Sequence, residues 1–227
     1  MKDSPYALKW VETAAELAKA RSLRRAAFEE ELGHDYGAML DDLDERSLVL
    51  LCSHAGRTIG TVRLSIRDGG PLEDEAQLRL DGWRDAGCFA DHEIAQCTRL
   101  AIVPEFRARG VSTLLMTHLY LEVVKRGVSL VFIDASVELL SYYTRLGFRR
   151  FCPTYRHPIL DRDYIPLVLF TGDAQHFQSI GSRLRRLAER DDACRARAAL
   201  ERVSAPPERG GASSGPAQRA QMVPARW

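Results

Sequence analysis

A basic, glycine-containing segment near the middle of the chain lies between two apolar stretches. Arg107-Ala108-Arg109-Gly110-Val111-Ser112 follows the apolar run Leu100 to Val103 and precedes an apolar helix pattern that begins at Thr113. This order predicts a strand, then a loop that presents backbone N–H groups, then a helix whose N-terminal end is electropositive. Gly110 permits close backbone approach, and the arginines neutralise negative charge. The sequence therefore predicts an anion site suited to a pyrophosphate.

The first half of the chain predicts a helix followed by a hairpin. Thr13-Ala14-Ala15-Glu16 is a capping box, and the apolar spacing that follows predicts an amphipathic helix ending near Gly33. Two apolar-rich segments, 47–53 and 57–65, flank a turn-forming His54-Ala55-Gly56 and predict an antiparallel hairpin. Gly60 in the second strand indicates a bulge or a close approach.

The remaining elements are predicted from apolar runs and from helix stop signals. Residues 66–92 are polar and irregular, with a short helical piece over 73–83. Beyond them we expect strands at 94–103, 129–135 and 165–171, helices at 112–126 and 137–145, and a charged helix over 183–202. Residues 204–227 are rich in Pro, Gly, Ala and Ser, which predicts a disordered tail.

Length and composition indicate one main domain over 1–182, then a C-terminal helix over 183–203 and the tail. The net charge of +1 indicates no overall preference for nucleic acid, and no nucleic-acid motif is recognised. The five cysteines lack disulfide or zinc spacing and the six histidines lack ligand spacing, which predicts a reduced cytoplasmic protein without a metal. We expect neither a secretion signal nor a membrane span.

Two motifs resemble those of the GNAT N-acyltransferases. The pattern Arg-x-x-Gly-x-small at 107–112 is similar to that family's acyl-CoA loop, with Ser112 where Gly or Ala is more usual, and Tyr143-Thr144-Arg145-Leu146-Gly147-Phe148 resembles its tyrosine and helix-end signature. The resemblance covers residues 10–172 and implies an α/β fold with a mixed, mostly antiparallel sheet flanked by helices. It implies an acyl-CoA or acyl-phosphopantetheine donor, held by Leu100, Ala101, Ile102, Val103, Arg107, Ala108, Arg109, Gly110, Val111, Ser112 and Thr113.

A second resemblance concerns the first half of the chain. Six residues follow the order seen in acyl-homoserine-lactone synthases and the related long-chain N-acyl amino acid synthases: Arg24, Phe28, Asp41, Asp44, Arg63 and Arg99. The resemblance implies that they bind the acceptor. His34 replaces the tryptophan of the homoserine-lactone enzymes and Gln96 replaces their glutamate, which disfavours a homoserine-lactone product. The alternative is that these charges form ordinary surface ion pairs and that Phe28 is a core residue.

Acyl transfer to an amine needs a neutral amine, an oxyanion site and a proton for the departing thiolate. Tyr143 matches the family's general-acid position, although Tyr142 is adjacent. Gln96 occupies the position of the acid but does not titrate, so Glu93 or an ordered water is the expected proton acceptor. Cys97 lacks an activating partner and is predicted to be structural.

We therefore expect an N-acyltransferase that moves an acyl group, preferably fatty, to the amine of an amino acid or similar molecule by direct attack in a ternary complex. A basic zone near the loop suits either CoA or acyl carrier protein as donor. Two alternatives stay open at this point. One is an acetyl-CoA-dependent acetyltransferase, and the other is a non-catalytic domain that binds an acyl thioester.

Overall fold

The computed structural model describes residues 5–31, 33, 36–37, 42–73, 75–87, 89–157, 161–188 and 190–204 of the 227-residue chain. Some residues that carried predictions lie outside these ranges: His34, Asp41 and residues 205–227 of the tail. The strands are β1 (Tyr6–Trp10), β2 (Leu48–His54), β3 (Arg57–Ile66), β4 (Ile94–Ile102), β5 (Leu130–Ser136), β6 (Arg149–Arg150), β7 (Tyr155–Arg156) and β8 (Asp163–Phe170). The α-helices are α1 (Ala14–Arg25), α2 (Leu43–Arg46), α3 (Leu80–Gly87), α4 (Val111–Lys125), α5 (Leu140–Leu146), α6 (Ala174–Ser179) and α7 (Cys194–Ser204).

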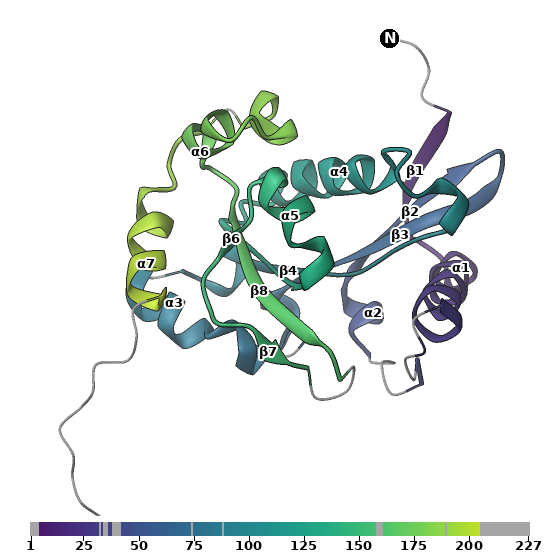
Figure 1. The fold of residues 1–227 in the computed structure, drawn as a ribbon, viewed down its shortest axis with the longest axis horizontal. Coiled ribbons are helices and arrows are strands. Elements are labelled where there is room, and N and C mark those ends of the chain that lie inside the picture. Colours follow the sequence, from purple (N-terminus) through teal and green to yellow (C-terminus); the bar gives the residue numbers. More distant parts are fainter. Residues whose placement is uncertain are drawn as a thin grey trace, which may run out of the picture.

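The described strands form one sheet in the order β1-β2-β3-β4-β5-β8-β6, with β7 also paired to β8. Of the pairs in this sheet, β4 with β5 is parallel and the others are antiparallel. Helices cover both faces of the sheet (Figure 1). The predicted mixed, mostly antiparallel α/β architecture is confirmed.

The two faces of the sheet carry different helices because successive strand residues point to opposite sides. We call the side under α4 and α5 the α4 face; its core includes Leu50 and Cys52 of β2, Leu115 of α4 and Leu146 of α5. We call the opposite side, under α1, α3 and α7, the α1 face. Two separate apolar clusters lie on the α1 face, one around Ala20, Val49 and Leu51 and the other around Trp83, Phe132 and Phe170.

The predicted hairpin is present as β2 and β3. Cys52 pairs with Gly60 but Ser53 pairs with Thr58, so β3 carries one extra residue beside Gly60. A Cβ at Gly60 would lie 3.1 Å from side-chain atoms of both Leu115 and Val111. Gly60 therefore lies beside a bulge and also allows the close approach of α4 to the sheet.

Two elements differ from their prediction near the N-terminus. The predicted capping box is present, with the Glu16 amide donating to Thr13 Oγ1 at 3.2 Å, but the α-helix ends at Arg25 and a π-helical segment, η1 (Ala26–Glu31), continues it. β1 was not predicted. It forms because Tyr6–Trp10 pairs in register with β2, and a five-residue segment carries too few apolar positions to show this pairing.

The predicted continuous helix over 183–202 is wrong. The segment contains a short 3₁₀ turn, η7 (Arg183–Arg186), and then α7 (Cys194–Ser204). Asp173 is 1% exposed, and its carboxylate forms ion pairs with Arg149 and Arg197. Its backbone forms an isolated β-bridge with Asp191. These contacts tie the chain between the two helical pieces to the domain, and a helix cannot run through that point.

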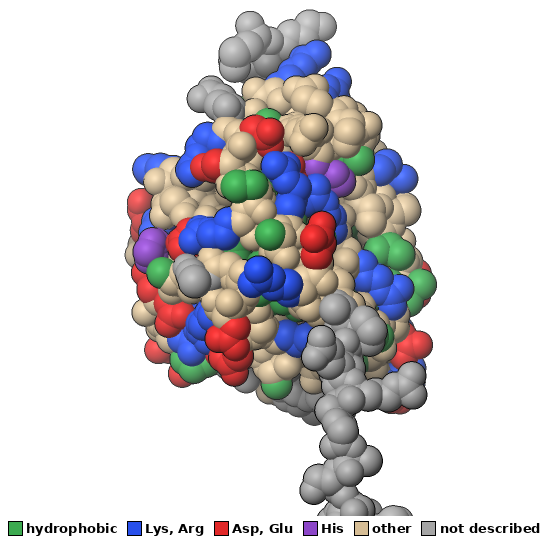
Figure 2. All heavy atoms as spheres, turned by 90° about the vertical axis from the view of Figure 1, so that its left-hand side faces the viewer, with side chains coloured by type: hydrophobic (Ala, Val, Ile, Leu, Met, Phe, Trp, Pro, Cys, Tyr) green, Lys and Arg blue, Asp and Glu red, His purple; other side chains and the backbone are tan. Residues whose placement is uncertain are grey.

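α7 packs on α3 through Ala196, Ala199 and Val203, which are buried. Arg195 forms an ion pair with Glu93 and lies 4.2 Å from the Phe89 ring centroid. The side of the molecule that carries α7 is a mosaic of basic and acidic side chains in which apolar groups are scattered (Figure 2). Within the described part of the chain, the helices are too short or too polar to cross a bilayer.

Candidate active site

The parallel strands β4 and β5 separate partway along their length. They pair over Ile94–Gln96 and Leu130–Phe132, after which β5 continues to Ser136 paired with β8, while β4 continues to Ile102 paired with β3. The backbone groups of β4 beyond Gln96 on the side of β5 therefore lie outside the ladder. Leu100 to Val103, predicted to bind the donor, follow this separation, whose vertex is at Gln96.

A bulge in β4 lies beside the opening. Arg63 pairs with Thr98 but Thr61 pairs with Ala101, so β4 has an extra residue relative to β3. Arg99 lies in this bulge. Its φ of +57° is a left-handed conformation that is unusual for a residue with a side chain. Because a bulge redirects side chains, Arg99 reaches the α1 face next to Thr98 and Arg63.

The predicted anion loop is exposed to solvent and ends at an uncapped helix. Ala108 has φ +57° and Gly110, the N-cap of α4, has φ +83°; no side chain caps the helix and its first turn carries no acid. The Arg107 Nε donates to the Ile102 carbonyl at 3.0 Å, and Arg109 lies over the Phe106 ring at 5.7 Å. The first amides of an α-helix lack intrahelical partners, so this end of α4 can receive an anion.

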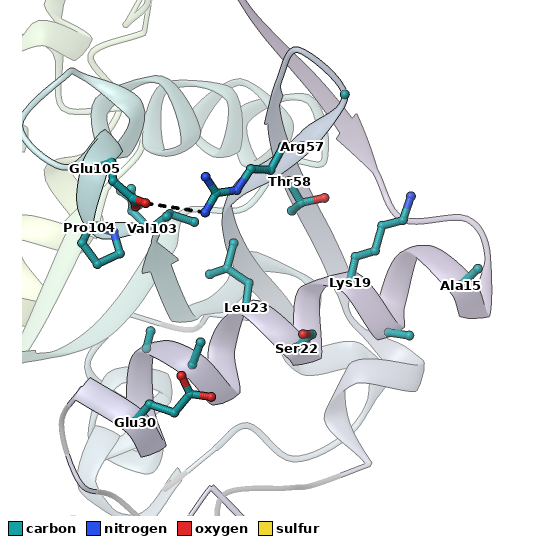
Figure 3. A pocket seen from close by; sticks show the side chains of 15 residues that line it. Ala15, Lys19, Ser22, Leu23, Glu30, Arg57, Thr58, Val103, Pro104 and Glu105 are labelled. Atoms are coloured by element: carbon teal, nitrogen blue, oxygen red, sulfur yellow. Dashed lines mark ion pairs between the residues drawn. The ribbon is translucent and has the colours of Figure 1, made fainter.

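An open groove of about 910 Å³ lies on the α1 face, next to residues 102–105, which precede this loop. It is lined on one side by small and polar residues of α1 and η1, and on the other by the β2–β3 turn and the end of β4, including Ile102 and Val103. Leu23 points from α1 into the groove, and Arg57 extends toward Glu105 at 3.8 Å (Figure 3). Space for a ligand therefore adjoins the carboxyl end of β4.

Four of the charged residues predicted to bind the acceptor, Arg24, Asp44, Arg63 and Arg99, form one buried network. Asp44 Oδ1 forms ion pairs with Arg24 at 2.6 Å and with Arg63 at 3.4 Å. Glu73 then bridges Arg63 at 2.6 Å and Arg99 at 2.5 Å. Arg24 and Arg63 are each only 1% exposed, so the alternative of ordinary surface ion pairs is wrong for them. The network lies on the α1 face between its two apolar clusters.

Asp44 holds its charge despite its burial. Desolvation alone would raise the pKa of this carboxyl, but the charge of Arg24, hydrogen bonds from Arg24 and Arg21, and the charge of Arg63 lower the pKa below its ordinary value. Asp44 is therefore ionised at neutral pH and compensates two buried guanidinium groups.

Glu73 is a network residue that sequence reasoning missed. It lies in the irregular segment between β3 and α3, where no periodicity marks a buried position. An acidic residue in a long loop is ordinarily solvated, and its role depends on where the loop folds back. Phe28, which was predicted to bind the acceptor, lies half-buried in η1, and that role stays a prediction.

Tyr143 is 6% exposed, and its ring contacts those of Phe148 and Tyr142 at 5.6 and 5.0 Å. Burial, together with the neighbouring Cys97 and Tyr142, raises the pKa of Tyr143 well above its ordinary value. Burial also raises the pKa of Tyr142, against an opposing effect of the Ser112 and Thr113 hydroxyls at the start of α4. Both phenols are protonated at neutral pH, as a proton donor requires.

The remaining predicted residues occupy different places along β4. Gln96 is 1% exposed at the vertex, and neither its amide nitrogen nor its oxygen has a hydrogen-bond partner among the described residues. Glu93 precedes β4 at the opposite end from the opening and bonds to Arg195 and to Ser129 Oγ, contacts that favour a structural role. Burial raises the pKa of Cys97 to about 12, so its thiol is not a ready nucleophile.

Separated parallel strands, an uncapped helix after one of them and a buried charged network beside the opening define a GNAT-fold N-acyltransferase. The model of the N-acyl amino acid synthase FeeM family matches residues 19–171, and the chain belongs to this family. None of the curated protein sequences compared with the chain matches it significantly. The family is that of an enzyme, so the alternative of a non-catalytic domain is set aside.

Solved structures agree on the fold. FeeM from uncultured soil microbes has a TM-score of 0.63 at 15% identity, with 80% of this chain and 97% of that chain covered. The CoA-dependent acyl-homoserine lactone synthase BjaI has a TM-score of 0.58 at 18% identity, covering 78% and 90%. An acyl-CoA N-acyltransferase from Pseudomonas aeruginosa has a TM-score of 0.53 at 21% identity, covering 72% and 99%.

Proposed function

We propose that this protein transfers a fatty acyl group from a CoA or acyl-carrier-protein thioester to the amine of an amino acid, by direct attack in a ternary complex. The observation that carries the proposal is the separation of β4 from β5 at Gln96, on the same strand that leads into the uncapped end of α4. A thioester lying in this opening would have its phosphate end at the loop and its carbonyl beside the freed backbone of β4.

The donor end would be held by residues 107–113 together with the strand end at 100–103. N–H groups at the start of α4 suit a phosphate, and the exposed arginines of the loop add positive charge. BjaI, a structural neighbour, is described as CoA-dependent, and one of its structures holds isopentyl-CoA. A CoA-type donor is therefore the first to test, and the acyl carrier protein is the second.

The acceptor end would be held on the α1 face. Arg63 or Arg99 would bind the acceptor's carboxylate, since each already binds the carboxylate of Glu73. Arg24, Phe28 and Asp44 would complete the wall behind it. Asp41, which lies outside the described residues, stays part of the proposed acceptor-binding set. We place the enzyme in the cytoplasm, because Cys52, Cys97, Cys152 and Cys194 are free thiols.

The chemical step needs a proton for the departing thiolate, which we assign to Tyr143. Cys97 supports direct attack because its protonated, buried thiol disfavours a covalent acyl-enzyme. The acceptor ammonium must lose a proton before it attacks, and a carboxylate or an ordered water is the expected proton acceptor.

The test is release of free thiol by the purified protein from octanoyl-CoA, palmitoyl-CoA and the same acyl groups on acyl carrier protein, with and without a mixture of amino acids. We expect release only when both donor and amino acid are present, with the N-acyl amino acid found by mass spectrometry. An acetyl-CoA arm tests the acetyltransferase alternative, and turnover with acetyl-CoA alone among the donors would replace the proposal.

A further inference from the structure

Asp134 lies on β5 just beyond the vertex of the strand separation. Phe132 pairs with Gln96, and Asp134 is the next residue of β5 on the same side. Successive residues of β5 point to opposite faces of the sheet. Val131, Ile133 and Ala135 belong to the α4-face core, whereas Leu130 and Phe132 belong to the α1-face core. Asp134 therefore faces the α1 side, where it is half-buried.

Arg99 lies across the opening from Asp134. Its side chain is 10% exposed and meets Glu73 together with Arg63, which puts it on the α1 side as well. Tyr164 of β8 lies near both groups. Burial is the main cause that raises the pKa of Tyr164, and the charges of Arg99 and Asp134 act on it in opposite directions. A basic wall on β4 thus faces an acidic residue on β5.

Gln96 lies at the vertex between these two walls. A buried amide without hydrogen-bond partners is destabilising, so such groups are uncommon unless a ligand or water completes their hydrogen bonds. Gln96 points to the same face as Asp134, because Gln96 pairs with Phe132 and Asp134 lies two residues after Phe132 on the same side of β5. This unsatisfied amide is an independent indication that a polar ligand enters here.

We propose that the opening on the α1 face binds a zwitterionic α-amino acid, with its carboxylate on Arg99, its ammonium on Asp134 and its nitrogen hydrogen-bonded to Gln96. This inference rests on the proposed function and takes the amino acid acceptor from it. What it adds is Asp134 as the partner and proton acceptor of the amine, and Gln96 as a second partner of the nitrogen. Arg99 can hold the substrate beside Glu73 because a guanidinium group has five N–H donors.

The proposed step keeps protons and electron pairs in balance. The Asp134 carboxylate takes one proton from the bound ammonium, and the freed nitrogen lone pair attacks the thioester carbonyl carbon. As the C–N bond forms and the C–S bond breaks, the sulfur leaves with the bonding electron pair. Tyr143 protonates the thiolate and is reprotonated, through water, by the second amine proton. Asp134 then returns its proton to solvent.

The first experiment compares Asp134→Asn with wild type over pH, using octanoyl-CoA or palmitoyl-CoA and the best amino acid. We expect kcat/KM to fall at least tenfold at pH 7 and to recover as the pH rises toward the ammonium pKa of the amino acid, where the free amine needs no base. Asp85→Asn, an exposed carboxylate on α3, is the matched control and should behave as wild type.

Several other charged or titratable groups lie around Asp134 and can influence this pH profile. They are Arg99 from β4, Tyr164 from β8, Cys152 from the segment after β6, and the surrounding Arg79, Glu138, Arg150 and Arg162, whose charges act on Cys152 or Tyr164. Among the groups just named, Glu138 is the carboxyl group besides Asp134 itself. Glu138→Gln is therefore a second control and should leave the profile unchanged.

The second experiment separates the two ends of the acceptor. Thermal stabilisation by phenylalanine and by phenethylamine, its decarboxylated counterpart, is measured without donor for wild type, Arg99→Gln and Asp134→Asn. Wild type should prefer the amino acid. Arg99→Gln should lose that preference, and Asp134→Asn should weaken both ligands. Leucine and isopentylamine form a second pair in case the aromatic side chain does not fit.

The outcomes separate this inference from the proposed function. Absence of thiol release with every donor and amino acid would count against the function itself. An active wild type whose Asp134→Asn variant keeps both its kcat/KM and its pH profile would overturn the role of Asp134. Equal stabilisation of wild type by amino acid and amine, or by neither, would overturn the zwitterion site.

Discussion

At the scale of single residues, the most constrained group is the Asp44 carboxylate. It is 8% exposed and is shared by Arg24 and Arg63, which are almost fully buried. Removing one partner of a buried ion pair leaves an uncompensated charge, which costs more than the pair contributes in total. The network therefore couples the shape of the proposed acceptor site to the stability of the domain.

We predict that Asp44→Asn lowers the free energy of unfolding by about 3–5 kcal/mol, measured by urea denaturation at pH 7. Glu45→Gln, an exposed neighbour, should change it by less than about 0.5 kcal/mol. Equal effects of the two substitutions would mean that the buried network does not stabilise the fold.

The stability should also depend on pH through Asp44. Its pKa is lower in the folded state than the unfolded value of ~3.9, so the folded state binds fewer protons in this range. The stabilisation is fully present above the unfolded pKa and is lost as the pH falls through the folded pKa. Wild type should therefore lose stability below pH ~4 more steeply than Asp44→Asn, as followed by denaturation at several pH values.

The two adjacent tyrosines give a second prediction at this scale. If Tyr143 is the proton donor, Tyr143→Phe should lower kcat by about 10²–10⁴-fold, the usual contribution of a general acid, while the KM for the donor changes little. Tyr142→Phe, which removes the hydroxyl near Ser112 and Thr113, should affect the donor KM more than kcat. The reverse pattern would move the catalytic role to Tyr142.

At the scale of elements, the site depends on irregularities in β4. The strand pairs with β5 over three residues, separates at Gln96, and then bulges at Arg99. The apolar run and the loop motif predict that a strand and helix exist here. They do not predict the bulge, because Arg99 is not a residue type that ordinarily adopts positive φ. Pairing with β3 on one side and not with β5 on the other determines its conformation.

A glycine at the end of α5 gives a prediction at this scale. Gly147 has φ +124°, and a Cβ there would lie 2.4 Å from an atom of the fully buried Phe177 ring. Gly147→Ala should therefore cost the backbone strain of an alanine at positive φ plus about 1–3 kcal/mol for displacing the ring.

Gly127→Ala is the control for that substitution. Gly127 ends α4 with φ +74° and has open space around it, so its replacement costs only the backbone strain. The difference between the two variants in thermal unfolding measures the contribution of Phe177 packing. No difference would mean that α6 can move away from α5 without loss.

At the scale of the whole molecule, the C-terminal segment is part of the domain. α7 packs on α3, and Arg195 reaches Glu93 at the start of β4. Glu93 was predicted as a catalytic base from its nearness in sequence to Gln96. Its ion pair with α7 and its hydrogen bond to Ser129 instead connect the C-terminal helix to the end of the sheet away from the opening.

This packing predicts a strong difference between two neighbouring alanines. Ala199 is fully buried against α3, whereas Ala198 is exposed. Ala199→Asp should lower the unfolding free energy by several kcal/mol, because it buries an unpaired carboxylate, and Ala198→Asp should be close to neutral. Limited proteolysis should then cut Ala199→Asp between η7 and α7. Resistance equal to wild type would contradict the docking of α7.

The sequence by itself determined the order of the main strands and helices, the anion loop and the family resemblance. These features are encoded locally, in apolar periodicity, capping residues and short motifs. Tertiary structure decided which charged residues meet: Glu73 pairs with Arg63 and Arg99, and Glu93 pairs with Arg195. It also brought Arg99 and Asp134 close enough to Tyr164 for both charges to act on it. Such pairings depend on where strands separate and loops fold back, and residues distant in the chain carry no local signal of their meeting.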